Sequence, residues 1–240
     1  MKITIAYIEE PPFYWTEPDG SVVGADIELA DVVLRAIGST QIKHQPTTFE
    51  ELLPGVSSGR WNMNVPIFVT QERSLLVDFG TPVWALGDGF LVAAGNPKGL
   101  DSYTAIARRD DARLAVVADT IQQRSALSYG VRDQQIFQFA RQEEAIDELL
   151  VGRIDAYAAT ALGNRVLAKR VGSSQVAVVA HASQNRPPFG AFSFSKHDSQ
   201  LCEAVDEQLK RYLGSVDHRQ RMAKYGLTPE EIDPVIKVRP

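Results

Sequence analysis

The sequence predicts an α/β fold built as two lobes of similar design. Short apolar strands alternate with helical patterns in the first half of the chain, and the same alternation returns in the second half. Such alternation is typical of a largely parallel sheet covered by helices. Two stretches rich in glycine and proline, 80–89 and 183–190, mark where the chain is expected to cross between the lobes. The length of 240 residues by itself fits either one large domain or two lobes of ordinary size.

The first lobe is predicted to begin with an alternating strand, which is followed by helices and further strands in turn. Its elements, in chain order, are a strand over 2–8, a helix over 26–37, a strand near 42–46, a helix over 49–58, a strand over 61–68 and a helix over 71–76. Thr48 followed by Glu51 predicts a capping box at the second helix. Asp26 and Thr70 are the expected N-caps of the other two helices.

The second lobe repeats this pattern. Its elements are a strand over 113–118, a helix over 121–129, a helix over 142–151, a strand over 154–159, a helix over 161–170 and a strand over 175–180. Thr120 followed by Gln123 predicts another capping box. Helix starts near 49, 71 and 121 follow strands, so their N–H groups should lie at the carboxyl edge of a sheet, where open α/β sheets bind ligands.

Composition and charge argue against several classes of function. Hydrophobic residues make up 44% of the chain and charged residues 23%, as in a soluble globular protein. No apolar run approaches the ~18 to 20 residues that a membrane span requires. The net charge is −5 and the basic residues are scattered, so we expect no nucleic acid as a partner.

Cysteine and histidine give no support to a metal site. The single Cys202, in a predicted helix over 198–213, has no second thiol to pair with and is expected to be packed or half-buried. The four histidines lack the spacing of metal ligands. We therefore expect neither a metal nor another cofactor.

The amino terminus already alternates like a strand and lacks the charged and apolar regions of a signal peptide. Two interpretations stay open from these residues. The protein is either cytoplasmic, or it is exported and its leader has been replaced by a start methionine.

The stretch T-Q-E-R at 70–73 is the first candidate binding motif. A threonine N-cap with an arginine three residues on gathers helix N–H groups and a planar guanidinium around one point, which suits a carboxylate. The simpler interpretation is a surface Arg73 paired with Glu72 or Asp78. On the motif alone this simpler interpretation is favoured, because an arginine in a first turn opposes the helix dipole.

Several ordered motifs together change that balance. They are P-P-F at 11–13, E-P-D-G-S-V-V-G-A-D-I-E-L-A at 17–30, T-F-E-E-L-L-P-G-V-S-S-G-R-W at 48–61, T-Q-E-R at 70–73, V-D-F-G-T-P-V at 77–83, V-G-R-I-D-A-Y-A at 151–158 and M-A-K-Y-G-L-T-P-E-E-I at 222–232. With them the chain resembles, over essentially its whole length, the polar-amino-acid family of bacterial solute-binding proteins, the extracytoplasmic receptors of ABC importers.

The resemblance implies a type II periplasmic binding protein, with two lobes joined by a two-strand hinge and a ligand cleft between them. Lobe 1 would comprise 1–87 plus 190–240 and the inserted lobe 2 would comprise 88–189, with hinge crossings near 84–90 and 183–192. It further implies a monomer that is periplasmic or lipid-anchored, a small zwitterionic ligand, and ABC permease subunits in the inner membrane as partners. By motif position Arg73 would bind the ligand carboxylate, with help from Thr120 and from the helix start at Thr70.

Departures from the family pattern point to an unusual ligand. Where amino-acid receptors of the family carry an aspartate for the ligand ammonium, five residues after Asp155, this chain has Thr160. Phe68 replaces a small hydroxyl residue two positions before Thr70. Phe13 and Phe49 fall at two other positions that face the ligand in the family.

The three phenylalanines suggest an aromatic box, since ring faces attract a diffuse cation. With Glu10 as a localised charge, the pattern resembles the ectoine-binding and hydroxyectoine-binding members of the family. The alternative is that Phe13 and Phe49 pack in the core. Trp84 is another aromatic candidate, although packing at the hinge is its simpler role.

Pro66 is a further departure, because it removes a backbone N–H from the predicted strand and implies an edge position or a bulge.

Three other functions stay open at this point. One is an ordinary amino-acid-binding receptor. Another is an enzyme similar to the cyclohexadienyl dehydratases, in which Glu10 would be the only candidate acid. The third is a sensor lobe of a membrane receptor or histidine kinase. We favour a receptor without catalysis, because the predicted cleft contains no acid–base pair or nucleophile constellation.

Overall fold

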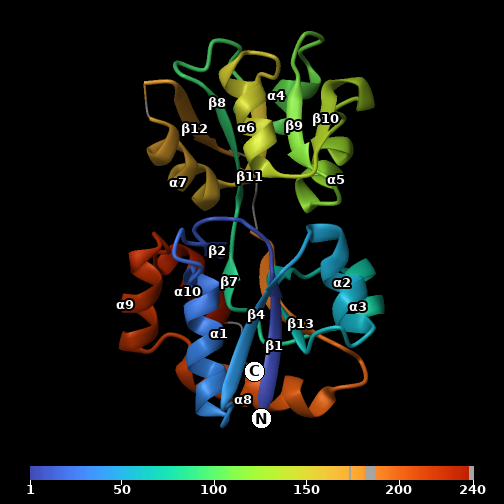
Figure 1. The fold of residues 1–240 in the computed structure, drawn as a ribbon. Coiled ribbons are helices and arrows are strands. Elements are labelled where there is room, and N and C mark those ends of the chain that lie inside the picture. The colour runs from blue at the N-terminus through green and yellow to red at the C-terminus, as the bar shows by residue number, and fades with distance from the viewer. Residues whose placement is uncertain (173, 182–186, 238–240) are drawn as a thin grey trace. The chain divides into compact units, whose positions relative to one another are not determined.

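The computed structural model describes residues 1–172, 174–181 and 187–237. The chain folds into two compact units, Met1–Ala85 with Pro188–Pro240 and Leu86–Pro187 (Figure 1). Each unit holds a sheet with helices packed on it, so the predicted two-lobed α/β fold is confirmed. The second expected crossing, near 183–192, lies partly outside the described residues.

The sheet of unit 1 is parallel on one side and antiparallel on the other. Its strand order is β4-β1-β5-β13-β6, and β7 also pairs with β13. The strands are β1 (Lys2–Tyr7), β4 (Gln41–Pro46), β5 (Met63–Phe68), β6 (Asp78–Phe79), β7 (Trp84–Ala85) and β13 (Phe189–Phe194). β1 runs parallel to β4 and β5, whereas β13 is antiparallel to β5, β6 and β7. The expected parallel sheet is therefore parallel only in part.

Helices cover both faces of this sheet. They are α1 (Ala25–Ala36), α2 (Phe49–Ser57), α3 (Gln71–Leu76), α8 (Ser199–Tyr212), α9 (Val216–Lys224) and α10 (Pro229–Lys237), and a short hairpin joins β2 (Trp15–Thr16) to β3 (Val22–Val23). Figure 1 shows α1 and α9 on one side of unit 1 and α2 and α3 on the other. α1 packs on α8 and α9, and α2 packs on α3. Cys202 is partly buried in α8 and is a free thiol, as expected.

Strand β5 leads to the candidate site and contains the unusual proline. All its residues except Phe68 are buried, and it lies between β1 and β13. The ladder between β5 and β13 shifts register between Ala191 and Ser193, opposite Pro66. The missing N–H of the proline therefore falls at an irregularity of the ladder, so of the two expected alternatives the structure favours a bulge over an edge position.

Unit 2 contains a five-stranded sheet in the order β10-β9-β11-β8-β12. Its strands are β8 (Asp88–Ala93), β9 (Leu114–Val117), β10 (Ile136–Phe139), β11 (Ala156–Thr160) and β12 (Val176–Ala180), and its helices are α4 (Tyr103–Ala107), α5 (Ile121–Ser128), α6 (Gln142–Leu150) and α7 (Ala161–Val171). β10, β9 and β11 are parallel, whereas β8 is antiparallel to both of its neighbours. The sequence analysis missed β8, β10 and β13.

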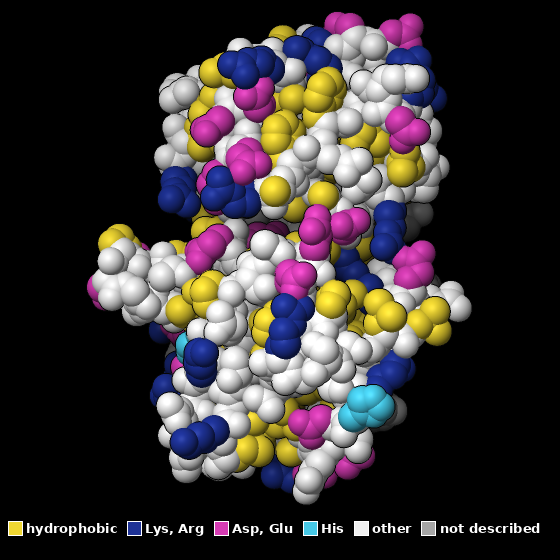
Figure 2. All heavy atoms as spheres, turned by 45° about the vertical axis from the view of Figure 1, so that its right-hand side comes forward, with side chains coloured by type: hydrophobic (Ala, Val, Ile, Leu, Met, Phe, Trp, Pro, Cys, Tyr) yellow, Lys and Arg dark blue, Asp and Glu magenta, His cyan; other side chains and the backbone are white. Residues whose placement is uncertain are grey.

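The surface agrees with the scattered charges of the sequence. Figure 2 shows acidic and basic side chains interspersed on the face that it draws. In the described part of the chain, no helix is long and apolar enough to cross a membrane. Nor do three or more of the described His, Cys, Asp and Glu side chains come together as a metal site would require.

Candidate functional site

The candidate site of unit 1 is built around Arg73, in the short helix α3 that follows β5. Its Nη1 donates to the carbonyl of Phe68 at 2.8 Å, and its guanidinium carbon lies 5.1 Å from the ring centroid of Phe49. The side chain is only 4% exposed. The arginine is therefore buried and does not lie on the surface, and the carboxylate of Asp78 pairs with Lys196 at 3.5 Å. A buried cation held in one orientation can receive an anion at little cost in side-chain entropy.

The start of α3 fixes the backbone at this cation. Thr70 is its N-cap, and the threonine Oγ1 accepts a hydrogen bond from the backbone N–H of Arg73 at 3.2 Å. Ser74 adds a bond from its hydroxyl to the carbonyl of Thr70 at 2.9 Å. The expected Thr70 cap is thus confirmed, and it stabilises the turn that carries the guanidinium.

The other predicted caps are wrong. Thr48 and Thr120 occupy N-cap positions, but neither side chain accepts a capping hydrogen bond. Thr120 Oγ1 instead donates to the carbonyl of Val117 at 2.7 Å, because the chain turns back on the end of β9 there. The side chain of Gln123 reaches past the cap position and accepts from the N–H of Asp119. Helix α1 begins at Ala25 after Gly24, so Asp26 lies inside its first turn and is not its cap.

Aromatic rings connect the Phe68 end of β5 to the turn at Phe13. Phe68 meets Trp84 edge to face, with ring centroids 5.1 Å apart and an interplanar angle of 82°. Trp84 in turn lies 5.9 Å from Phe13. Both distances are typical of stabilising aromatic pairs. We call these three residues the aromatic wall. Phe13 is 2% exposed and packs as a core residue, whereas Phe68 and Phe49 are half-buried.

Glu10 lies at the Phe13 end of this wall, in a turn held by backbone pairing with Tyr14. The hydroxyl of Tyr14 donates to Glu10 Oε2 at 3.1 Å. Burial raises the pKa of Tyr14 well above its usual value, and the negative charges of Glu10 and Asp26 raise it further, so the phenol stays protonated and keeps this bond. The structure therefore brings Arg73, Phe49, Phe68, Phe13 and Glu10 into one continuous set of contacts.

Asp26 was missed as a site residue. It is fully buried, and both of its carboxylate oxygens accept the indole N–H of Trp84, at 3.1 and 3.3 Å. Burial raises its pKa well above the ordinary value. No local pattern distinguishes this aspartate from a helix cap, because its partner lies 58 residues away in the sequence.

One candidate in unit 2, Thr160, lies at the end of β11. Thr160 is buried there, is the N-cap of α7, and accepts from the N–H of Gly163 at 3.0 Å. Asp88 stands directly opposite Thr160 in the ladder of β8 and β11. Gln122, from the first turn of α5, donates to one oxygen of Asp88 at 2.7 Å, and Tyr103 donates to the other at 3.0 Å. Burial raises the pKa of Asp88, while these two bonds lower it in part.

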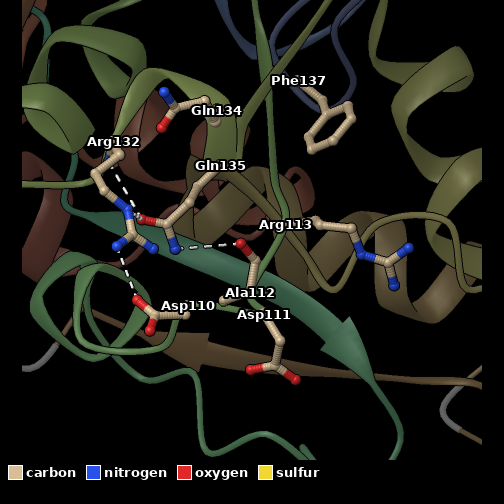
Figure 3. Close-up of a pocket in the computed structure, with 8 residues that line it drawn as sticks. All are labelled: Asp110, Asp111, Ala112, Arg113, Arg132, Gln134, Gln135 and Phe137. Atoms are coloured by element: carbon tan, nitrogen blue, oxygen red, sulfur yellow. Dashed lines mark hydrogen bonds and ion pairs between the residues drawn. The ribbon is translucent and has the colours of Figure 1, made fainter.

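A separate pocket of unit 2 includes none of the predicted residues (Figure 3). Its charged side chains have ion-pair partners. Arg132 pairs with Asp110 at 2.7 Å and also donates to Gln135. Arg113, at its other end, pairs with Asp155 at 3.0 Å. Because these guanidinium groups are held in ion pairs and are largely open to water, the pocket has the character of a solvated surface.

Comparison with known proteins shows which family the chain belongs to. The family model for bacterial extracellular solute-binding proteins, family 3, matches residues 3–228. The chain belongs to this family. A curated relative, "Probable amino-acid ABC transporter periplasmic-binding protein y4tE" from Sinorhizobium fredii, is 32% identical over 238 residues, which cover 96% of this chain and 78% of the relative.

Solved structures of similar fold support this assignment. The crystal structure of EhuB in complex with hydroxyectoine has a TM-score of 0.87 at 24% identity and covers 99% of this chain and 95% of its own. The arginine-, lysine- and histidine-binding protein ArtJ from Geobacillus stearothermophilus has a TM-score of 0.85 at 23% identity, with 98% and 99% covered. At these identities the likeness shows that the family 3 protein described here shares their fold.

The N-cap bonds generate a prediction about stability. Replacing Thr70 by Ala should lower the free energy of unfolding by about 1 kcal/mol, because the Arg73 N–H loses its acceptor. The matched control is Thr48→Ala, which also changes an N-cap threonine but removes no capping bond and should stay within about 0.5 kcal/mol. Urea denaturation followed by circular dichroism measures both, and equal losses would contradict the assignment of caps.

Proposed function

We propose that this protein is an extracytoplasmic receptor of an ABC importer and binds a small zwitterion with a carboxylate and a delocalised or bulky cation. Ectoine and hydroxyectoine are our first choices of ligand. The observation that carries the proposal is the continuous set of contacts from Arg73, through Phe68 and the aromatic wall, to Glu10. It offers opposite charges at its two ends with aromatic rings in between.

Arg73 is assigned the ligand carboxylate. Its guanidinium lies at the end of β5 against the ring of Phe49, and Thr70 fixes the backbone at the same point. A planar guanidinium can bind a carboxylate through two parallel hydrogen bonds, which gives both strength and orientation. Thr120 is assigned as a further contact from unit 2 on the basis of the family resemblance.

The aromatic wall and Glu10 are assigned the cationic end. A ring face attracts a cation by about 0.5 to 2 kcal/mol per contact, and the attraction suits a charge that is spread over several atoms. Phe68 is half-buried and so is the ring that can reach a ligand, whereas buried Phe13 supports the wall from behind. Glu10 adds a full charge that Tyr14 holds in place.

The relatives supply the transport context of the proposal. The y4tE protein is described as a probable amino-acid ABC transporter component, so an ABC permease in the membrane is the proposed partner. EhuB was crystallised with hydroxyectoine, which makes that molecule a direct probe. We propose binding without turnover by a monomer, so incubation with prephenate or arogenate should yield no aromatic product.

An ordinary amino-acid receptor is the second candidate, and Asp88 is the observation that favours it. The residue lies opposite Thr160, the position at which the family resemblance implies an aspartate for the ligand ammonium. Side chains that face each other across an antiparallel pair of strands are about 5 Å apart. The carboxylate of Asp88 on β8 is therefore close to the place that an aspartate at position 160 on β11 would occupy. In that case Asp88 and Thr160 would together receive a primary ammonium.

Removal of the guanidinium tests the carboxylate assignment. Arg73→Ala should weaken binding of hydroxyectoine by about 2 to 5 kcal/mol, since the ligand carboxylate would be buried without its partner. Arg60→Ala is the matched control, because Arg60 also stacks on an aromatic ring of unit 1, at 4.9 Å from Trp61, but is exposed. Isothermal titration calorimetry measures both variants. Unchanged affinity in Arg73→Ala would refute the assignment.

Removal of one ring tests the cation assignment. Phe68→Ser should weaken binding of hydroxyectoine more than binding of an ordinary amino acid, because a diffuse cation depends more on ring faces than a primary ammonium does. The expected difference is about 0.5 to 2 kcal/mol. Phe137→Ser, at an exposed phenylalanine of unit 2, should change neither affinity. Equal losses for both ligands in Phe68→Ser would remove the argument for the aromatic wall.

A further inference from the structure

Trp84 is the central ring of the aromatic wall, since it contacts both Phe13 and Phe68 while the other two rings are joined through it. It is 4% exposed. A change in the orientation of its indole would therefore shift the support of the half-buried Phe68. The position of this one ring controls the shape of the wall.

The indole is held from two sides. On one side its N–H donates to both oxygens of Asp26. On the other it packs over Gly190 of β13, the residue with which Trp84 pairs in the ladder. A Cβ added to Gly190 would come within 2.0 to 2.3 Å of three ring atoms of Trp84. Only glycine leaves room for the ring at this position, so the packing against Gly190 fixes where the indole lies. The hydrogen bonds to the Asp26 carboxylate fix its rotation.

Asp26 also holds the other end of the wall through its backbone. Its N–H donates to the carbonyl of Phe13 at 3.0 Å, and the preceding N–H of Ala25 donates to the carbonyl of Pro12 at 3.0 Å. These N–H groups belong to the first turn of α1, where helix donors have no partner within the helix. One residue thus positions Phe13 by its main chain and Trp84 by its side chain.

Burying the carboxylate of Asp26 costs free energy, which suggests that the residue has a role beyond stabilising the fold. A carboxylate removed from water loses its hydration, and Glu10 nearby adds repulsion of like charge. An apolar side chain of similar size would fill the same space at lower cost. A buried acid that accepts the indole N–H of the central ring of a candidate site is best explained by the need to orient that ring.

We propose that Asp26 is a positioning residue that sets the selectivity of the site for the cationic end of the ligand. It does so by orienting Trp84, which holds Phe13 and Phe68 in place. The proposal rests on the proposed function, because it takes the aromatic wall to contact the ligand cation. The ligand itself need not touch Asp26.

Three variants separate positioning from charge. Asp26→Asn keeps an oxygen that accepts the indole N–H but removes the charge. Asp26→Leu removes both, and Trp84→Phe keeps a ring but removes the N–H. Titration calorimetry with hydroxyectoine and with the best-binding ordinary amino acid gives two dissociation constants for each variant. The ratio of these constants measures selectivity and is unaffected by a uniform loss of active protein.

We expect Asp26→Leu and Trp84→Phe to raise the dissociation constant for hydroxyectoine about tenfold relative to that for the amino acid, as the loss of one buried hydrogen bond would. Asp26→Asn should retain the ratio of the unaltered protein within about threefold, because an amide oxygen still accepts the bond. A ratio that changes as much in Asp26→Asn as in Asp26→Leu would show that the charge acts directly. An unchanged ratio in Asp26→Leu would overturn the proposal.

A second measurement keeps this test independent of the ligand assignment. The indole N–H signal of Trp84, identified by its loss in Trp84→Phe, reports the bond to Asp26 in a nitrogen–proton NMR spectrum. It should move in Asp26→Leu and stay near its original position in Asp26→Asn. If the signal behaves so but no zwitterion binds the unaltered protein, the proposed function fails while the bond is confirmed. If the signal does not move in Asp26→Leu, the positioning role is wrong whatever the ligand.

Discussion

The candidate site depends on one buried cation, the guanidinium of Arg73 at the end of β5. Its bond to the carbonyl of Phe68 and its contact with Phe49 bring the strand end and the start of α2 to the same point. Because a buried charge is costly without polar partners, the segments that supply those partners must keep their places. The bulge at Pro66 and the cap at Thr70 lie on either side of this point and shape the backbone that leads to it.

Two acids of unit 1, Asp26 and Glu10, lie around the aromatic wall. Asp26 is bound to Trp84, and Glu10 is bound to Tyr14. A carboxylate beside the rings favours a cation at that end of the wall. Burial raises the pKa of Asp26, because removal from water disfavours the charged form of its carboxyl group. Such perturbed acids are characteristic of binding sites.

Local sequence rules recovered the parts of the structure that depend on neighbours in the chain. The strand 61–68, the helix 71–76 and the Thr70 cap follow from alternation and from residues within one turn, and all three are present. These rules failed where contacts between residues far apart in the sequence determine the structure. Asp26 has the sequence pattern of a helix cap, but its carboxylate is buried in the core and accepts a hydrogen bond from Trp84. Strands β8 and β13 lie beside Gly-rich and Pro-rich stretches. Those stretches indicated crossings between the lobes, so the strands next to them were not recognised. Asp88 could be found only from the ladder that sets it opposite Thr160.

The central claim is that the site selects a zwitterion by a carboxylate clamp and an aromatic wall. The most direct test is a thermal-shift screen of the purified protein with ectoine, hydroxyectoine, betaines and the common amino acids. A ligand that binds only the folded state at about 100 times its dissociation constant stabilises it by about 2.7 kcal/mol, which raises the melting temperature by several degrees. We expect such a rise with ectoine, hydroxyectoine or a betaine. A rise only with an ordinary amino acid would contradict it and would point to Asp88 as the group that receives the ammonium.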